Sequence, residues 1–340
     1  MDTLQSQFIK FHDTIKLDAK DKQVLIEKRE EVEEIINNGV SEFEKSFFNQ
    51  GSYSTFTGIL PLEDGDYDLD RGLRFEIDRN SNTPKEIKKI IFNTLVSKFG
   101  ENNVKVKNPC VTVSFPKDNV HIDIAVYCIE NDNYFLARGK LNSKEENIKW
   151  EEADPVELTE KINNAMENSE DRKQFRRVIR YLKRWKDIKF KNQDNKPTGI
   201  GISVFAVKNF TVCKNEDYLS GNTTYDDISA LRNLVNTMIN SFSNTYDVDR
   251  NLFYPRLKVF LPVKPYTDVY ERVSNIQMEA FKNKLEKLRD SLDEAIYSTD
   301  LSESTKLLSK QFGDDFPVIE QKETAENFGT RAIISDYPSA

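Results

Sequence analysis

Three aspartates occupy the two stretches whose residue types and spacing could do chemistry. Asp68 and Asp70 lie in YDLD, and Asp123 lies in VHIDIAV. From residue 67 to residue 77 apolar and polar residues alternate, which predicts a β-strand with Asp68 and Asp70 side by side on its polar face. Two carboxylates so close raise each other's pKa. A divalent cation removes that cost, and Mg²⁺ typically binds one or two carboxylates together with substrate phosphates.

Asp123 is expected to join this pair. Residues 120–126 predict a second, very apolar strand with Asp123 on its other face, and a carboxylate there needs a partner. If the two strands are neighbours, three carboxylates can hold two metal ions that activate a hydroxyl and stabilise a leaving phosphate. A solvated strand face is the alternative, because the Asp-x-Asp pattern alone is common.

Gly51 and Ser52 precede the first aspartate pair and strengthen the metal interpretation. Glycine allows the backbone to approach a phosphate closely, and serine offers a hydroxyl to it. Gly-Ser, a spacer, two alternating aspartates and a later strand aspartate resemble the motif of the DNA polymerase β-like nucleotidyltransferase superfamily. Within it, QGSY at 50–53 and YDLDRG at 67–72 are similar to the bacterial cyclic-oligonucleotide synthases, the CD-NTases.

Later stretches are also similar to the CD-NTases, so the resemblance covers most of the chain. They are PVKP at 262–265 and FGDDFP at 312–317. The resemblance implies catalytic, metal-binding roles for Asp68, Asp70 and Asp123 with two Mg²⁺ ions, for which Mn²⁺ can substitute. It implies nucleotide binding by Gln50, Gly51 and Ser52.

The implied activity is synthesis of a cyclic di- or trinucleotide messenger from NTPs, ATP and/or GTP, in bacterial antiphage (CBASS) signalling. A cyclic-nucleotide-activated effector is then the downstream partner. Two other functions stay open: a linear polymerase or transferase acting on RNA or an antibiotic, and a non-enzymatic nucleotide sensor. The first would show a basic acceptor groove, and the second a degenerate set of carboxylates.

The stretch from 172 to 189 predicts an amphipathic helix with a basic flank. The flank consists of Arg172, Arg176, Arg180 and Lys183. Like charges at this spacing destabilise an isolated helix, so the flank indicates either an anionic partner or a solvated basic face. The Lys-x-Trp pattern resembles the family's element whose lysine contacts the donor triphosphate, which implies nucleotide binding by Lys183, with Lys186 as the second choice.

Thr198 and Gly199 begin another predicted helix, where family members often carry a phosphate-binding serine. Thr198 is therefore a second nucleotide-binding candidate, because a hydroxyl and helix N–H groups suit an anion. The alternative is an ordinary N-cap of a core helix.

Composition limits the remaining possibilities. A chain of 340 residues holds one large or two ordinary domains, and 38% hydrophobic with 31% charged residues is typical of soluble globular proteins. No apolar run suits a membrane span or a signal peptide, so a cytoplasmic protein is expected. Three scattered cysteines and two histidines argue against a zinc site. The lack of a predicted zinc site and the net charge of −8 together predict no direct sensing of double-stranded DNA.

The predicted fold is α+β: an α/β palm with a mixed sheet, followed by a C-terminal helical domain. We expect helices in residues 1–50, strands in 51–130 around a helix from about 83 to 100, a polar connection in 131–172 with a helix from near Pro155, and mainly helices in 226–310. The predicted domains are 1–165 (bracing helices and palm), 166–320 (helical domain closing the nucleotide cleft) and 321–340 (flexible tail). The tail ends at Ala340, and its resemblance to conjugated CD-NTases implies that an E1/E2-like partner joins Ala340 to a target amine.

Overall fold

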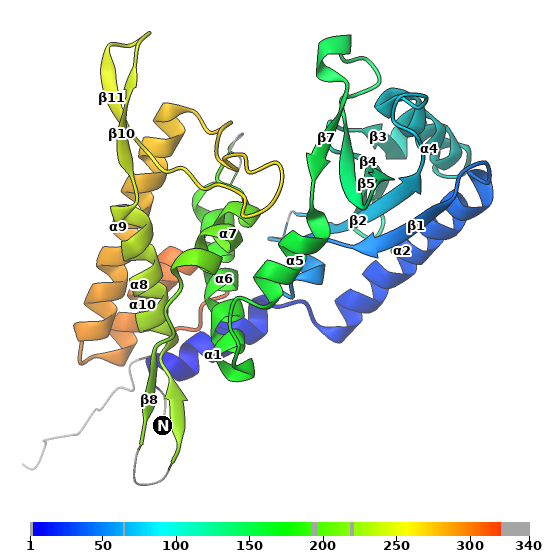
Figure 1. Ribbon diagram of the computed structural model, residues 1–340. Helices are drawn as coiled ribbons and strands as arrows, with labels where there is room; N and C mark the ends of the chain where they lie inside the picture. The colour runs from blue at the N-terminus through cyan, green and yellow to red at the C-terminus, as the bar shows by residue number, and fades with distance from the viewer. Residues whose placement is uncertain (1–2, 64, 192, 194–195, 218–220, 321–340) are drawn as a thin grey trace, which may run out of the picture.

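The computed structural model describes residues 3–63, 65–191, 193, 196–217 and 221–320 (Figure 1). They form two lobes, a palm built on a β-sheet and a helical half, with a cavity between them. No helix among these residues combines the length and the apolarity needed to cross a membrane. The predicted tail, residues 321–340 with Ala340, lies outside the described residues.

Within the described residues, the palm holds a seven-stranded mixed sheet. Five of its strands have the order β1-β2-β5-β4-β3; β6 also pairs with β5, and β7 pairs with β6. Strands β2 and β5 run parallel, and the other neighbours are antiparallel. This confirms the predicted α+β class. The strands are β1 Lys45–Asn49, β2 Tyr67–Glu76, β3 Val104–Val106, β4 Cys110–Phe115, β5 Val120–Glu130, β6 Asn133–Arg138 and β7 Lys149–Ala153.

Two helices cover one face of this sheet, α2 (Ala19–Gly39) and α4 (Pro84–Phe99). Helix α4 begins at a capping box of Thr83 and Glu86 and is followed by Gly100, as its sequence predicted. The apolar residues of β2 and β5 join those of α2 and α4 in one buried core. Period-2 alternation therefore turns Asp70 and Asp123 to the opposite face, toward the helical half.

The helical half is organised around α6 (Ser169–Lys189), whose predicted apolar face is completely buried. Two hairpins, β8–β9 and β10–β11, project from this half (Figure 1). The other elements are α1 Leu4–Ile15, α5 Pro155–Asn163, α7 Gly199–Asn209, α8 Asp227–Asn240, α9 Asn275–Tyr297, α10 Leu301–Phe312, β8 Lys214–Glu216, β9 Thr223–Tyr225, β10 Ser243–Asp247 and β11 Leu252–Arg256.

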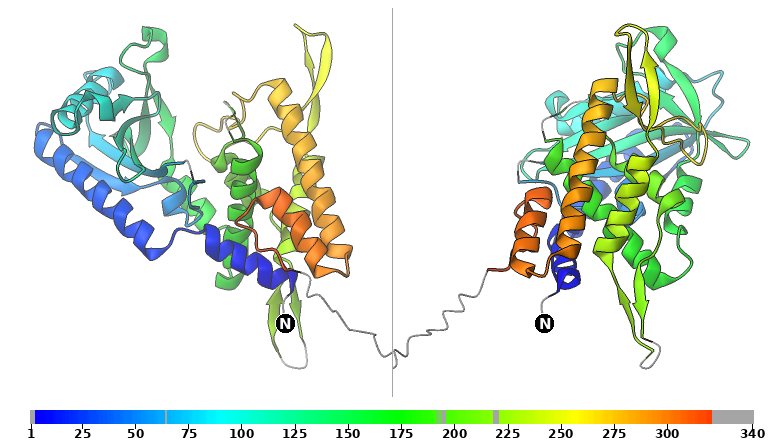
Figure 2. Two further views of the ribbon diagram at one scale, coloured as in Figure 1. Left: turned by 180° about the vertical axis from the view of Figure 1, so that it is seen from behind. Right: turned by 90° about the vertical axis from the view of Figure 1, so that its left-hand side faces the viewer.

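The two N-terminal helices belong to different lobes (Figure 2). Phe8 and Phe11 of α1 pack in the core of the helical half, whereas Leu25 and Val32 of α2 pack in the core of the palm. The chain crosses between the lobes at residues 16–18, and again around α5. The predicted first domain, residues 1–165, therefore does not pack as one body, because α1 packs against α6, α8 and α10 of the helical half.

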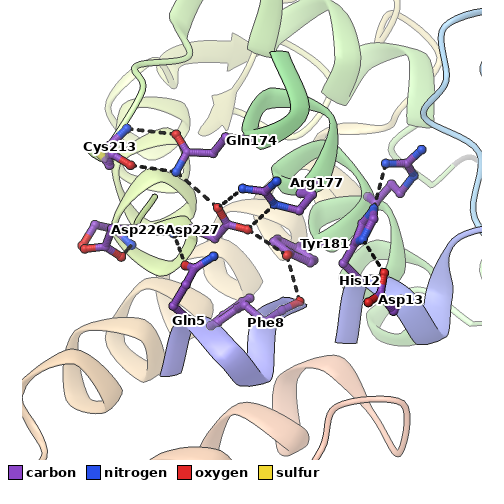
Figure 3. A network of polar contacts seen from close by, with 12 residues as sticks. Gln5, Phe8, His12, Asp13, Gln174, Arg177, Tyr181, Cys213, Asp226 and Asp227 are labelled. Atoms are coloured by element: carbon purple, nitrogen blue, oxygen red, sulfur yellow. Dashed lines mark hydrogen bonds and ion pairs between the residues drawn. The ribbon is translucent and has the colours of Figure 1, made fainter. Parts of the chain in front are cut away.

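A buried polar network fastens α1 to the helical half (Figure 3). The carboxylate of Asp227, on α8, is fully buried and accepts hydrogen bonds from Arg177 and Gln174. The hydroxyl of Tyr181 lies 3.0 Å from this carboxylate and 2.9 Å from the carbonyl of Phe8. The side chain of Gln5 accepts a hydrogen bond from the amide of Asp227 at 2.7 Å. Each buried charge in the network therefore has a partner, as burial requires.

Three stretches differ from the sequence prediction. Residues 45–49 are strand β1 and not helix; Phe47 packs toward the palm core and Phe48 toward the opposite face, which an amphipathic helix would not allow. Strands β6 and β7 lie in the predicted polar connection, and hairpin β10–β11 lies in the region predicted as mainly helical. These strands are short and partly exposed, so their apolar pattern is weak.

Candidate active site

The three aspartates meet on neighbouring strands. In the parallel pairing of β2 with β5, Asp70 is opposite Asp123, and Asp68 is opposite His121. The predicted adjacency of the two strands is therefore confirmed. All three carboxylates line the cavity between the lobes, which has a volume of about 670 Å³ and which we call the central cavity.

Negative charge accumulates at this end of the central cavity. Burial, together with the charges of Asp123 and Asp68, raises the pKa of Asp70 to about 6. Asp123 accepts a hydrogen bond from the Thr112 hydroxyl, and the ammonium of Lys107 lies 3.4 Å from its carboxylate. The cations present only partly neutralise the site, as expected where a further cation binds.

The sequence analysis missed three of these neighbours, Asp66, Lys107 and His121. The ring of His121 lies 3.6 Å from Asp68 through Nδ1 and 3.3 Å from Asp66 through Nε2. His121 shares the strand face of Asp123, so the face on which it lies was detectable from alternation alone. Lys107 follows β3, far from Asp123 in sequence, and only the folded sheet brings the two side chains together.

The donor set fits Mg²⁺ accompanied by phosphates. No three His, Cys, Asp or Glu side chains among the described residues converge as a complete metal cage. Mg²⁺ does not need one, because it usually takes one or two carboxylates and completes its shell with water and substrate phosphates. The raised pKa of Asp70 is the observation that supports this fit, since a bound cation would stabilise the ionised carboxylates.

Gly51 and Ser52 begin the short helix α3 (Gly51–Ser54) directly against the carboxylates, and we call this start of α3 the Gly51-Ser52 turn. Gly51 has φ +72°, and a Cβ added to it would lie 2.0 Å from Oδ2 of Asp70. Both the backbone conformation and the close approach therefore require glycine. Ser52 lines the central cavity, as does Gln50, whose side-chain oxygen accepts a hydrogen bond of 3.0 Å from Tyr127.

The basic flank of α6 binds carbonyl oxygens. Arg180 donates to the carbonyls of Phe56 and Gly58, and Arg184 donates to that of Leu60. Lys183 donates to both the carbonyl and the hydroxyl of Thr57, at 3.0 and 2.9 Å. Residues 56–60, which follow the Gly51-Ser52 turn, are therefore held against α6. The solvated-face interpretation is wrong for Arg180 and Lys183, which donate to backbone carbonyls, and the anionic partner stays a prediction.

Lys183 also lines the central cavity, although it is only 7% exposed. Burial, reinforced by the charges of Lys186 and Arg180, lowers the pKa of Lys183 to about 7. Lys186 lines the same cavity, but its ammonium pairs with Asp187 at 2.6 Å. An anion entering the cavity would therefore relieve an unfavourable charge on Lys183, which makes it the stronger candidate of the two lysines.

Thr198 is the N-cap of α7, and its exposed hydroxyl accepts a hydrogen bond from the amide of Gly201. Among the described residues that line the central cavity, Gly199 and Ser203 are present and Thr198 is absent. The N-cap interpretation agrees with the structure, and the phosphate contact of Thr198 stays a prediction. Ser203, a turn further along, is 2% exposed and was missed because it resembles an ordinary core serine.

A comparison with known families addresses this part of the chain directly. Residues 45–127 match the family described as cyclic GMP-AMP synthase DncV-like, nucleotidyltransferase domain. The match includes β2, β5, the Gly51-Ser52 turn and all three aspartates. Residues 45–127 are a DncV-like nucleotidyltransferase domain. The resemblance to the CD-NTases is thereby confirmed for the segment that carries the carboxylates.

Relatives of this nucleotidyltransferase domain extend the likeness beyond it. A cyclic GMP-AMP synthase of Escherichia albertii is 26% identical over 207 residues, which cover 58% of this chain and 44% of the relative. The chain thus aligns with less than half of that relative's length.

Solved structures share the fold of both lobes. CdnG of Bradyrhizobium diazoefficiens in complex with GTP gives a TM-score of 0.69 at 14% identity, covering 92% of this chain and 96% of that one. CdnC of E. coli MS115-1 with ATP gives a TM-score of 0.64 at 16% identity, covering 92% of this chain and 98% of CdnC. DncV of Vibrio cholerae in complex with the linear intermediate pppA(3′,5′)pG gives a TM-score of 0.59 at 18% identity, covering 82% of this chain and 72% of DncV. The nucleotidyltransferase domain is therefore attached to a helical half of the same architecture as in these proteins.

Proposed function

We propose that this protein is a nucleotidyltransferase that makes a cyclic di- or trinucleotide from NTPs. One observation carries the proposal: Asp68, Asp70 and Asp123 of the DncV-like nucleotidyltransferase domain line the same central cavity as Lys183. ATP and GTP are the proposed substrates, because the structures of CdnC and CdnG with a similar fold contain them.

In the proposed reaction a 3′-hydroxyl oxygen attacks the α-phosphorus of a bound NTP, the bond to pyrophosphate breaks, and the hydroxyl proton is released. Asp68, Asp70 and Asp123 would hold two Mg²⁺ or Mn²⁺ ions, which when bound supply charge neutralisation and hydroxyl activation. Gln50, the backbone of Gly51, the hydroxyl of Ser52 and the ammonium of Lys183 would orient the triphosphate. Catalysis then consists of positioning and electrostatic stabilisation.

A second transfer on the linear intermediate would close the ring. The product would be a messenger of antiphage (CBASS) signalling with a receptor effector downstream, as the family resemblance implies. CdnC has been solved in complex with a HORMA protein, so a HORMA protein is a further proposed partner. A linear polymerase or RNA transferase and a non-enzymatic sensor remain the competing functions.

The decisive experiment incubates the purified protein with four labelled NTPs and Mg²⁺ and then treats the products with phosphatase. A product whose mobility phosphatase leaves unchanged identifies a ring, which has no terminal phosphate, whereas a ladder whose members all shift on losing their 5′-triphosphate identifies a linear polymerase. The matched control is Asp68→Asn with Asp70→Asn, which keeps the shapes of both side chains and should lower product formation by several orders of magnitude. Substantial product from the folded double variant would contradict the assigned roles.

The tail stays a separate proposal, because residues 321–340 lie outside the described part of the chain. We propose that an E1/E2-like partner conjugates Ala340 to a target amine, and that synthesis does not need the tail. Deleting residues 330–340, or making Ala340→Glu, should leave product formation unchanged and should block adduct formation with that partner and ATP. An adduct that survives Ala340→Glu would contradict the conjugation proposal.

A further inference from the structure

Two buried threonines connect the triphosphate-binding groups proposed for the two lobes. Thr57 is fully buried and Thr55 is 5% exposed, and both line the central cavity. The ammonium of Lys183 lies 2.9 Å from the hydroxyl of Thr57, and this hydroxyl lies 2.9 Å from that of Thr55. The hydroxyl of Thr55 lies 3.2 Å from the carbonyl of Gly51 and 3.3 Å from that of Ser52. A continuous polar chain thus runs from α6 to the Gly51-Ser52 turn.

Every group in this chain has a partner on both sides. The ammonium of Lys183 only donates, so the Thr57 hydroxyl accepts from it. The Thr57 proton can then point to the Thr55 hydroxyl, and the Thr55 proton to the carbonyls of Gly51 and Ser52, which also accept from the amides of Thr55 and Thr57. In this arrangement both buried hydroxyls donate and accept, which favours one orientation of each.

Packing confines Lys183 from another side. A Cβ added to Gly199 would lie 3.3 Å from Cε of Lys183, so the lysine stem already lies against the start of α7. The ammonium is therefore held at its tip by Thr57 and along its stem by α7. Side chains held in this way lose little further freedom on binding a ligand.

We propose that Thr57, supported by Thr55, is a positioning residue that fixes the Lys183 ammonium relative to the Gly51-Ser52 turn. The inference rests on the proposed function, in which these two groups bind one triphosphate from opposite lobes. Thr57 itself need not contact the nucleotide. Its hydroxyl sets the separation between the two contacts before the nucleotide arrives.

The test is Thr57→Val, which keeps the shape of the side chain and removes the hydroxyl. We expect KM for the NTP, and Kd for a triphosphate analogue that cannot release pyrophosphate, to rise about 10-fold, with kcat changed by less than about 3-fold. Thr57→Ser should restore both constants. Thr55→Val, one step removed, should give a smaller rise in the same direction.

Two comparisons separate positioning from general destabilisation. Thr305 is also fully buried, and its hydroxyl donates to Ser302 within the helical half, so Thr305→Val is the matched control and should leave KM and Kd unchanged. In a Lys183→Met background, Thr57→Val should have no further effect on analogue binding, because the two residues act through one another.

Unchanged KM and Kd in Thr57→Val, or an equal loss in the Lys183→Met background, would overturn the inference. If Thr57→Val does not fold, KM and Kd measured on Thr55→Val and Thr57→Ser test the inference instead. A wild-type protein that binds the analogue but makes no product contradicts the proposed function alone, since analogue binding still reports on Thr57.

Discussion

Replacing Lys183 by methionine should stabilise the protein while weakening its binding of nucleotides. The side chain is buried, and its pKa falls from 10.5 to about 7, chiefly through burial. Methionine has a similar length and no charge, so it removes the cost of burying the ammonium. Sites selected for binding often keep such unfavourable charges, because the ligand compensates them.

The magnitude follows from the pKa. At 1.36 kcal/mol per pH unit, the depression corresponds to about 5 kcal/mol of unfavourable free energy when the lysine is charged. Methionine leaves the hydroxyl and carbonyl of Thr57 without this donor, which costs up to about 3 kcal/mol. The free energy of unfolding should therefore rise by about 2 kcal/mol. Affinity for a triphosphate should fall at least about 10-fold, because a charged hydrogen bond is lost.

The assay is thermal unfolding as a function of pH, with nucleotide binding measured by titration. Below pH 7 the lysine is charged in both the folded and the unfolded states, so the gain in the free energy of unfolding of Lys183→Met over wild type is at its full value. As pH rises through 7 the folded protein loses this proton while the unfolded chain keeps it, so the advantage should shrink. A variant less stable than wild type at pH 6, or an advantage independent of pH, would refute the reasoning.

Lys88→Met is the matched control. Lys88 is 1% exposed and donates to the carbonyls of Lys107, Asn108 and Gly139, away from the central cavity. Its pKa is lowered only to about 8, and three carbonyls would lose their donor. We therefore expect Lys88→Met to destabilise the protein and to change nucleotide affinity far less than Lys183→Met does. If both substitutions stabilise the protein, burial of a lysine alone explains the stability gain of Lys183→Met, without a binding role.

Four further predictions concern single positions. Asp70→Asn should raise the stability of the metal-free protein by about 3 kcal/mol above pH 6. In thermal unfolding the gain should shrink as pH falls from 6 toward 4, where the wild-type carboxyl becomes protonated. Gly51→Ala should lower the rate of product formation at least about 100-fold with unchanged circular dichroism, because its Cβ would displace the carboxylate of Asp70; a near-wild-type rate would contradict the close approach. Thr198→Ala should lower the free energy of unfolding, measured with denaturant, by about 1 kcal/mol through loss of the N-cap. An altered KM for the NTP would support Thr198 as a phosphate contact. Asp227→Asn should destabilise the protein by about 3–5 kcal/mol, because Arg177 loses its buried counter-charge, without changing the Kd for nucleotides.

Much of the palm could be predicted because its information is local. Alternation in β2 and β5 assigns Asp70 and Asp123 to the face opposite the core, and the capping box and final glycine mark both ends of α4. These signals need only residues within a few positions of one another. The same rule assigns His121 to the face of Asp123, but alternation does not show that its ring lies beside Asp68.

The rest depends on contacts between distant segments. Arg180 and Lys183 read as a basic flank, and nothing in the helix reveals that their partners are carbonyls of residues 56–58. Lys107 reaches Asp123 only because β3 and β4 extend the sheet. The pattern of α1 is amphipathic, but amphipathicity does not indicate which of two cores receives the apolar face.

The division of the N-terminal helices between lobes has a consequence for synthesis on the ribosome. The palm is contiguous from α2 to β7, so its core can form while the helical half is still being translated. Helix α1 precedes the palm in the chain, yet Phe8 and Phe11 pack against Phe312 and Phe316, at and just beyond the end of α10. The apolar face of α1 therefore lacks these partners while the palm and most of the helical half are synthesised, exposed to chaperones and to aggregation. The helical half closes only when the end of α10 reaches α1.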